Sequence, residues 1–246
     1  MTASKQRWKT APAGLEPANG NVHVFCAALD LPPRRLLQLT AALSEDECER
    51  ARRVRAERDR QRFLSGRGTL RELLGACARV EPAELAFAYG EFGKPRVAAP
   101  ARAQVLHFNL AHSDSLALYA IADRELGVDL ERIRAVDCVE RIASRFFSPR
   151  EEACLLALPA TQRLEAFFNC WTRKEAYLKA IGRGLDDYLP QIEVSLAPGE
   201  PAELLDTPFE SGRWFLQSLT PMPGFVGALA THSADSTVNC WTWGSP

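Results

Sequence analysis

The sequence predicts an α+β fold made of two similar halves. A strand pattern, then helical patterns, then further strand patterns occur once before the polar turn Asp123–Glu125 and once after it. That turn lies near the middle of the 246 residues, and a hydrophobic content of 46% is enough to build a core on both sides of it. We therefore expect a disordered leader over residues 1–20, an N-terminal half over 21–124 and a C-terminal half over 125–246.

The N-terminal half is expected to begin with a buried strand over Val22–Ala28. Ser44 and Glu47 match the S-x-x-E capping box, which predicts one helix that runs through the following arginines to Cys77. Pro82 breaks this pattern, since proline cannot continue a helix. Strands follow over Leu85–Tyr89, Val105–Asn109 and Leu116–Ile121, with a polar Ala-His-Ser-Asp-Ser turn expected between the last two.

The C-terminal half repeats this order, beginning with a strand over Leu126–Leu130. Ser148 is expected to cap a helix, because proline follows at the first helical position and a second S-x-x-E pattern ends at Glu151. A long helix is expected from Arg163 to Ile181, closed by Gly182. The other expected elements are a helix over Asp137–Phe146 and strands over residues 192–196, 214–219, 226–230 and 238–243.

The bulk composition argues against a nucleic-acid or membrane partner. The formal net charge is -1, so no global field attracts the chain to either. Residues Met1–Gly20 lack the apolar region of a signal peptide, and no apolar run approaches the roughly 18 residues of a membrane helix. The seven cysteines show no C-x-x-C spacing, as expected of reduced thiols. We therefore expect a cytoplasmic protein.

Residues 47–71 form an arginine-rich segment with nine arginines and four acids. A basic helical face of this kind favours phosphates or an acidic partner. The alternative is a solvated helix on which glutamate and arginine side chains pair. The sequence alone leaves both interpretations open.

Asp129 and Glu131 stand two residues apart in an expected strand, so their side chains point to the same face. Two carboxylates in that position repel each other unless a cation or a basic group lies between them. Oxygen ligands alone favour Mg2+ or Mn2+ over zinc. The alternative is a pair of solvent-facing acids at a strand end, because a D-x-E pattern by itself is not specific.

Glu175 and Lys179 share one face of the expected long helix, with Trp171 one turn further back. An acid and a base so placed can serve one charged ligand, the acid through a metal and the lysine on a phosphate. The alternative is an ordinary helix-stabilising pair worth about 0.2–0.5 kcal/mol, with Trp171 in the core. Lys174 points about 100° away from Glu175, so it would serve a neighbouring part of any ligand.

Glu151 and His112 also allow two interpretations each. As the third helical residue after Ser148, Glu151 can bond back to the cap backbone, but it can equally serve as a metal ligand or general base. His112 lies in the expected polar turn, where a lone histidine is more often a hydrogen-bonded structural residue. Its place after Lys94 in the order of motifs favours a phosphate contact instead.

Five motifs, in this order, resemble those of the Sfp-type 4'-phosphopantetheinyl transferases. That family carries G-K-P, F-N-x-S-H-S, G-x-D-x-E, F-F-S-x-x-E and W-[ST]-x-K-E-A-[YF]-x-K-x-x-G-x-G-L. The matching segments are Gly93–Pro95, Phe108–Ser113, Gly127–Glu131, Phe146–Glu151 and Trp171–Leu185. One departure is Ala111, which replaces the usual serine, so one hydroxyl contact to the coenzyme is expected to be missing.

The resemblance implies a pseudo-twofold pair of α+β halves with the active site between them. It implies that a serine of an apo acyl- or peptidyl-carrier protein attacks the β-phosphorus of coenzyme A, and that 3',5'-ADP leaves. Mg2+, or Mn2+ in its place, would lie on Asp129, Glu131 and Glu175, while Glu151 or Glu175 would take the serine proton directly or through water. The implied coenzyme contacts are Arg50, Arg62, Lys94, Pro95, Ala111, His112, Lys174 and Lys179, of which Lys179 would neutralise the pyrophosphate.

Two alternatives remain open at this point. One is a relative that binds the carrier or coenzyme A without turnover, and the other is an unrelated Mg2+-dependent phosphoesterase. Smaller, single-half trimeric enzymes of the same class are disfavoured because this chain has both halves, so we expect a monomer. Carrier proteins of this class are typically acidic around their serine, and the arginine-rich segment is suited to help dock them.

Overall fold

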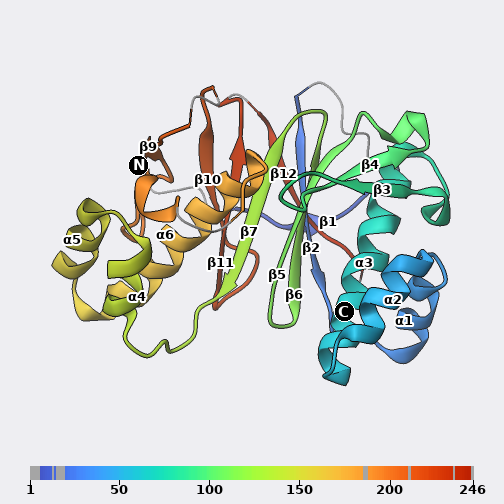
Figure 1. Ribbon diagram of the computed structural model, residues 1–246, viewed down its shortest axis with the longest axis horizontal. Coiled ribbons are helices and arrows are strands. Elements are labelled where there is room, and N and C mark those ends of the chain that lie inside the picture. The colour runs from blue at the N-terminus through green and yellow to red at the C-terminus, as the bar shows by residue number, and fades with distance from the viewer. Residues whose placement is uncertain are drawn as a thin grey trace.

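The computed structural model describes residues 6–12, 14, 20–184, 188–209, 212–234 and 236–244. Two sheets lie next to each other, each covered by its own group of helices (Figure 1). The first sheet has the strand order β1-β12-β2-β6-β5 and the second has the order β10-β11-β7. The predicted α+β fold class is therefore confirmed, with a sheet and its helices on either side of the meeting between β5 and β7.

The first sheet is built mainly from the N-terminal half of the chain. A long helix, α3, packs on it through buried leucines such as Leu70, Leu73 and Leu74. The strands are β1 (Lys9–Thr10), β2 (Val22–Ala28), β5 (His107–Ser113), β6 (Leu116–Ala122) and β12 (Val238–Thr242), and the helices are α1 (Pro33–Thr40), α2 (Glu45–Arg53) and α3 (Glu57–Ala78). A separate hairpin consists of β3 (Ala86–Tyr89) and β4 (Pro95–Ala99).

The predicted single helix through the arginines is wrong, because the chain turns between Arg53 and Glu57. The capping box that includes Glu47 is present. The Glu47 carboxylate is only 1% exposed and forms ion pairs of 2.6 Å with both Arg67 and Arg71 on α3. A buried carboxylate is tolerated only when it is paired in this way, so α2 folds back onto α3.

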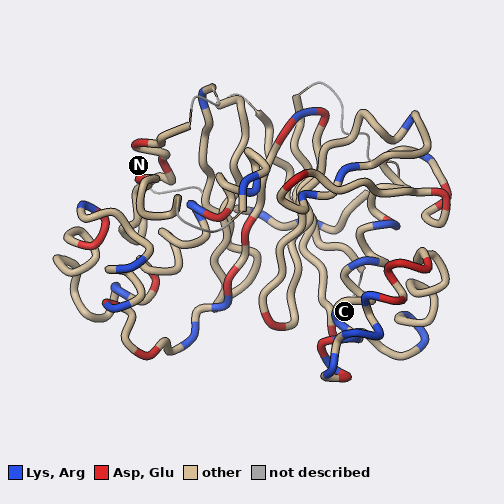
Figure 2. The backbone as a smooth tube through the Cα atoms, in the orientation of Figure 1, with Lys and Arg blue, Asp and Glu red and all other residues tan. Residues whose placement is uncertain are grey.

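The outer part of the arginine-rich segment is a mixed surface rather than a purely basic one. Lys and Arg alternate with Asp and Glu along this part of the backbone (Figure 2). Arg53 pairs with Glu49, and Arg60 pairs with Glu57. The interpretation as a solvated helix with glutamate–arginine pairs therefore holds for these residues.

Both ends of the chain differ from the predicted organisation. Lys9–Thr10, within the predicted disordered leader, pair in parallel with Trp241 and Thr242 of β12, whose open edge offers backbone hydrogen bonds. The rest of that leader lies partly outside the described residues. β12 itself returns to the first sheet and pairs in parallel with β2, so the last strand of the predicted C-terminal half lies among N-terminal strands. The boundary at residue 125 stays a prediction.

The second sheet carries the three C-terminal helices. α6 packs across β7 and β11, and its buried face includes Phe168 and Tyr177 (Figure 1). The strands are β7 (Leu126–Arg132), β10 (Phe215–Leu219) and β11 (Phe225–Thr231), and the helices are α4 (Val139–Phe146), α5 (Pro149–Ala157) and α6 (Ala160–Ala180). A small hairpin of β8 (Glu193–Val194) and β9 (Leu204–Asp206) lies beside α5. Among the described helices, none has the length and apolar character that a membrane span requires.

Side chains of β5 connect the two sheets where they meet. The Val128 N–H of β7 donates to Asn109 Oδ1 at 2.8 Å, and the Arg132 N–H donates to Ser113 Oγ at 3.0 Å. β5 thus continues through residues that the sequence placed in a turn, and His112 lies within a strand. Alternation along β5 directs Asn109 and Ser113 towards β7 and His112 to the opposite face.

Candidate active site

The site depends on a close approach between β7 and α6. A Cβ atom at Gly127 would lie 2.1 Å from the Ala176 carbonyl oxygen and 2.4 Å from the Ala180 nitrogen, so only glycine fits there. This approach brings Lys179 of α6 to Asp129 of β7. The Lys179 Nζ donates to Asp129 Oδ1 at 2.6 Å.

Two further acids, Glu131 and Glu175, act electrostatically on this contact, and with Asp129 they form what we call the acid cluster. Asp129 is 6% exposed and Glu175 is 4% exposed. Burial, followed by the charges of Asp129 and Glu131, raises the pKa of Glu175 to about 7, although Lys179 opposes the shift. Burial also raises the pKa of Asp129 and of Glu131. Each of these acids is therefore harder to ionise than in water, and the two charged neighbours of Glu175 add to the effect of burial.

Lys179 supplies the positive charge of the cluster. Burial alone would lower its pKa, but the attraction of Asp129, then of Glu175 and Glu131, outweighs burial and raises it. The ammonium therefore stays charged at neutral pH. One cation faces three acids, which leaves an excess of negative charge in a poorly solvated place.

The donor set fits a hard divalent cation. Asp129 Oδ2 is buried and has no hydrogen-bond partner among the described residues. Ser113 Oγ donates to Glu131 Oε2 at 2.8 Å and fixes that carboxylate, so one face of the cluster is held in place. In the described ranges, no three His, Cys, Asp or Glu side chains already stand together as a metal site. Mg2+ needs only one or two carboxylates, because it keeps several of its waters.

A basic cavity adjoins the acid cluster. Its volume is about 200 Å³, and four of the predicted coenzyme contacts line it: Arg50, Arg62, Pro95 and His112. Partial desolvation, then the charges of Lys179 and Arg62, lower the pKa of His112, while Asp129 opposes them. His112 therefore lies between this cavity and the acid cluster.

The two arginines of the cavity differ in whether carboxylates neutralise their guanidinium groups. Arg62 Nε lies 2.6 Å from Asp30 Oδ1, and its Nη1 lies 2.9 Å from Asp114 Oδ1. These two carboxylates neutralise Arg62. The pKa of Asp30 is lowered chiefly by Arg62, and that of Asp114 by Arg132 and then by Arg62. Arg50 instead donates to the Tyr89 hydroxyl at 2.9 Å and lies 5.2 Å above the Tyr89 ring. Arg50 thus keeps its charge available to an anion.

Lys94 lies on the far side of Pro95, against a second cavity of about 490 Å³. Its Nζ donates to Glu125 Oε2 at 2.5 Å, to the Leu126 carbonyl at 3.2 Å and to the Ala180 carbonyl at 2.8 Å. These contacts fasten the loop between β3 and β4 to the start of β7 and the end of α6. The structure therefore gives Lys94 a role in joining the two parts of the fold, beside its predicted phosphate contact.

Glu151 and Lys174 form a separate buried ion pair on another face of α6. They are 2% and 0% exposed. The Glu151 carboxylate also accepts from the Ser148 N–H at 2.7 Å and from the Val194 N–H at 2.9 Å, while Lys174 Nζ donates to the Leu189 carbonyl at 2.7 Å. The cap interpretation of Glu151 is thus present in the structure.

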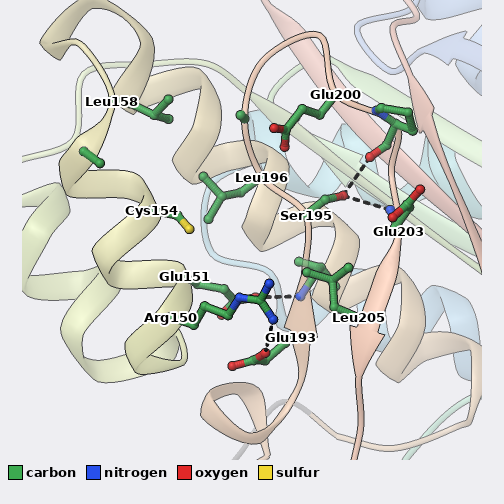
Figure 3. A pocket seen from close by; sticks show the side chains of 14 residues that line it. Arg150, Glu151, Cys154, Leu158, Glu193, Ser195, Leu196, Glu200, Glu203 and Leu205 are labelled. Carbon is green, nitrogen blue, oxygen red and sulfur yellow. Dashed lines mark hydrogen bonds and ion pairs between the residues drawn. The ribbon is translucent and has the colours of Figure 1, made fainter.

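Glu151 also borders a cavity of about 580 Å³ between α5 and the segment that follows β8 (Figure 3). Arg150 and Glu193 face each other across its edge, and Ser195 bonds within the loop behind it (Figure 3). None of Asp129, Glu131, Glu175 or Lys179 lines this cavity. This C-terminal cavity is therefore a different place from the acid cluster.

The remaining predicted residues are also placed by the structure. Ala111 is 3% exposed and lies on the β5 face that Asn109 and Ser113 turn towards β7. Trp171 packs edge-on against Phe146, as its core interpretation requires. The sequence did not single out Asn109 and Ser113, although their spacing in F-N-x-S-H-S is the signal that would have shown them on one face of a strand.

Family models match both parts of the chain. A model of the 4'-phosphopantetheinyl transferase superfamily matches residues 125–230, and a model of the N-terminal part of 4'-phosphopantetheinyl transferases matches residues 32–124. The 4'-phosphopantetheinyl transferase HetI of Nostoc sp. is 42% identical over 224 residues, which cover 91% of this chain and 92% of that protein.

Two further relatives come from Bacillus subtilis. A 4'-phosphopantetheinyl transferase is 32% identical over 65% of this chain and 69% of its own, and the transferase Sfp of strain 168 is 26% identical over 78% and 84%. The solved holo-[acyl-carrier-protein] synthase of Thermotoga maritima matches 43% of this chain and 61% of its own at 23% identity, with a TM-score of 0.35, which is too partial to add to the fold. Since HetI is similar over most of both chains, this chain belongs to the 4'-phosphopantetheinyl transferase family.

Proposed function

We propose that this chain transfers the 4'-phosphopantetheine arm of coenzyme A to a serine hydroxyl of an apo acyl- or peptidyl-carrier protein. The products are the holo carrier and 3',5'-ADP. Family membership supports the reaction class and the use of coenzyme A. The observation that carries the assignment to particular residues is the contact between Lys179 and Asp129 beside two further buried or half-buried acids.

Asp129, Glu131 and Glu175 are the residues that would hold Mg2+, with Mn2+ as an alternative. When bound, the cation would supply charge neutralisation for the pyrophosphate of the coenzyme. The unpaired Asp129 Oδ2 and the raised pKa values of all three acids support this placement, because a cation would offset the burial that raises each pKa and, at Glu131 and Glu175, the repulsion from neighbouring acids.

Lys179 and the basic cavity would bind the rest of the coenzyme. Lys179 keeps its ammonium charged and sits against the acids, which suits it to a pyrophosphate oxygen. Arg50 and His112 line the adjoining cavity and are available to the other phosphates. Transfer of this kind depends on in-line positioning and neutralised charge more than on covalent help from the protein.

Glu175 is the better candidate for accepting the serine proton. Without a bound cation the pKa of Glu175 is about 7, near the operating pH at which a base works best. A cation on Glu175 would lower this pKa, so Glu175 would serve as the base when Asp129 and Glu131 hold the metal. The Glu151 carboxylate already accepts two backbone N–H bonds and pairs with Lys174, which leaves it little freedom to meet a substrate. We therefore place Glu175, directly or through water, in this role and assign Glu151 and Lys174 to support of α6.

Intact mass spectrometry of apo carrier domains tests the function. A panel of carriers is incubated with the enzyme, Mg2+ and coenzyme A, and again without the metal. We expect one carrier at least to gain the mass of a single phosphopantetheine arm, and only when the metal is present. A relative without turnover would bind without any mass gain, and a phosphoesterase would release phosphopantetheine to water.

The sequence and the cysteines bear on the oligomeric state and the location of the protein. We expect a monomer in the cytoplasm, since the chain contains both predicted halves and all seven cysteines are free thiols in the structure. Gel filtration with light scattering measures the first expectation. Cell fractionation measures the second.

A further inference from the structure

Three aromatic side chains, two of them exposed, gather around one arginine beside the end of α6. The Arg183 guanidinium lies 5.7 Å from the ring centres of Phe92 and Tyr188 and 5.2 Å from that of Phe209. We name these four residues the aromatic rim. Phe92 comes from the turn between β3 and β4, whereas the other three belong to the C-terminal half of the chain.

The rim adjoins the proposed active site on both of its sides. Arg183 follows Gly182, which lies just beyond the end of α6 and has a φ of 67°. Both residues are thus about one helical turn from Lys179 along the chain. Phe92 precedes Gly93, which lines the basic cavity with His112. A molecule that covers the rim would therefore lie at the edge of both the acid cluster and the basic cavity.

The rim is unusual in its exposure. Phe92 is 51% exposed and Tyr188 is 36% exposed. Within the described part of the chain, Tyr89 at 41% is the other aromatic side chain that is exposed to this degree. Clustered aromatic residues and arginines are the side chains that dominate the energy of protein–protein contacts.

The chemistry of the rim favours a protein over the coenzyme. Coenzyme A is a polyanion, and the cations suited to it lie in the cavity that holds Arg50 and His112. The rim has one guanidinium among three rings. A guanidinium stacked on rings presents its N–H groups at its edge, where they fit a carboxylate, while the exposed faces of Phe92 and Tyr188 fit an aliphatic side chain.

We infer that the aromatic rim is the docking surface for the acidic carrier protein, with a carboxylate of the carrier at Arg183 and an apolar side chain on Phe92 and Tyr188. This inference rests on the proposed function, since a folded acceptor must lie beside the basic cavity while its serine reaches the acid cluster. Docking there would span both halves of the enzyme, so it would hold the serine beside Lys179 and Asp129.

Steady-state kinetics of carrier modification test the inference. The variants are Phe92→Ala and Arg183→Glu, with coenzyme A and an acidic apo carrier varied in turn. Arg213→Glu is the matched control for the charge, since Arg213 is an exposed arginine that lies 4.9 Å from the centre of the Phe215 ring and does not belong to the rim. Leu205→Ala, at a side chain 45% exposed, is the control for lost apolar surface.

We expect each rim variant to raise the KM for the carrier by about tenfold or more, with the kcat and the KM for coenzyme A within about twofold of the unmodified enzyme. Both controls should leave all three constants unchanged. Phe92 is an exposed turn residue, so Phe92→Ala should leave the fold intact. This variant therefore tests the inference even if Arg183→Glu lowers the melting temperature.

A rise in the KM for coenzyme A instead of the carrier would overturn the inference and assign the rim to the nucleotide. Unchanged constants in both rim variants would overturn it as well. Absence of transfer by the unmodified enzyme on every carrier would contradict the proposed function itself, so the two failures are distinguishable.

Discussion

Glu175 illustrates how much the surroundings decide the chemistry of a single residue. From the sequence it was one member of an ordinary helical Glu–Lys pair or of a metal site. In the structure, burial and two neighbouring carboxylates raise its pKa to about 7. Spacing along a helix predicted that Glu175 and Lys179 share a face, but the sequence could not show that Asp129 meets them, because that contact crosses 50 residues.

The pH dependence of stability should report on Glu175. A carboxyl whose pKa is raised on folding binds its proton more tightly in the folded state, so stability is lost as the pH rises from about 4.5 to 7. In the absence of divalent metal, the unmodified protein should lose up to about 3 kcal/mol more than Glu175→Gln between pH 4.5 and pH 8. Urea unfolding at several pH values measures this difference.

Glu165→Gln, at an exposed acid of the same helix, is the control for this experiment and should follow the unmodified protein. Added Mg2+ at pH 8 should recover part of the lost stability of the unmodified protein, because ligands that bind only the folded state stabilise it. Equal pH slopes in Glu175→Gln and the unmodified protein would show that Glu175 is not buried among acids.

Glu151 is a second residue whose role the sequence left divided between cap and catalysis. Replacing it with glutamine should destabilise the fold by about 3–5 kcal/mol, because it leaves the buried Lys174 ammonium without a carboxylate. The double variant Glu151→Gln, Lys174→Met should be more stable than Glu151→Gln alone, since no unpaired charge remains. Urea unfolding, with transfer activity corrected for the folded fraction, measures both effects. Unchanged stability with at least about tenfold lower activity would return Glu151 to the catalytic role.

At the scale of helices and strands, local sequence signals located the starts of helices correctly. They did not locate where helices and strands end. Capping boxes predicted the starts at Ser44 and Ser148, and both are present. The break after Arg53 was missed because it depends on a buried ion pair between two helices, which no local pattern reveals. β5 was predicted too short, since the polar residues that lengthen it are satisfied by β7 rather than by water.

Gly127 is the element-scale determinant of the site, because it sets the distance between β7 and α6. Gly127→Ala should destabilise the protein by at least about 2 kcal/mol and abolish transfer, since the added Cβ overlaps the Ala176 carbonyl and forces α6 away from β7. Gly66→Ala is the control for stability. A Cβ at Gly66 would meet Leu29 at an ordinary 3.7 Å, and alanine favours the helix, so stability should hold or rise. Normal stability of Gly127→Ala would refute the close approach.

At the scale of the whole molecule, the sequence predicted the fold class and the order of elements but not how the parts are joined. The parts are connected by hydrogen bonds between residues far apart in the chain. Lys94 Nζ donates to the Ala180 carbonyl, and the Val128 N–H donates to Asn109 Oδ1. β12 returns across the molecule to β2, which the alternation of its residues could not indicate. Side-chain alternation specifies which face of a strand is buried but not which strand lies beside it.

The most direct test of this account is the transfer rate of Asp129→Asn on an apo carrier, measured across a Mg2+ titration at saturating coenzyme A. Asp129 contributes the contact with Lys179 and the unpaired oxygen for the cation, so we predict a loss of at least about 100-fold that Mg2+ does not restore, or about 2.7 kcal/mol of barrier. Asp137→Asn, at an exposed acid of the same half, should keep full activity. Near-normal turnover of Asp129→Asn at saturating Mg2+ would contradict the proposed active site.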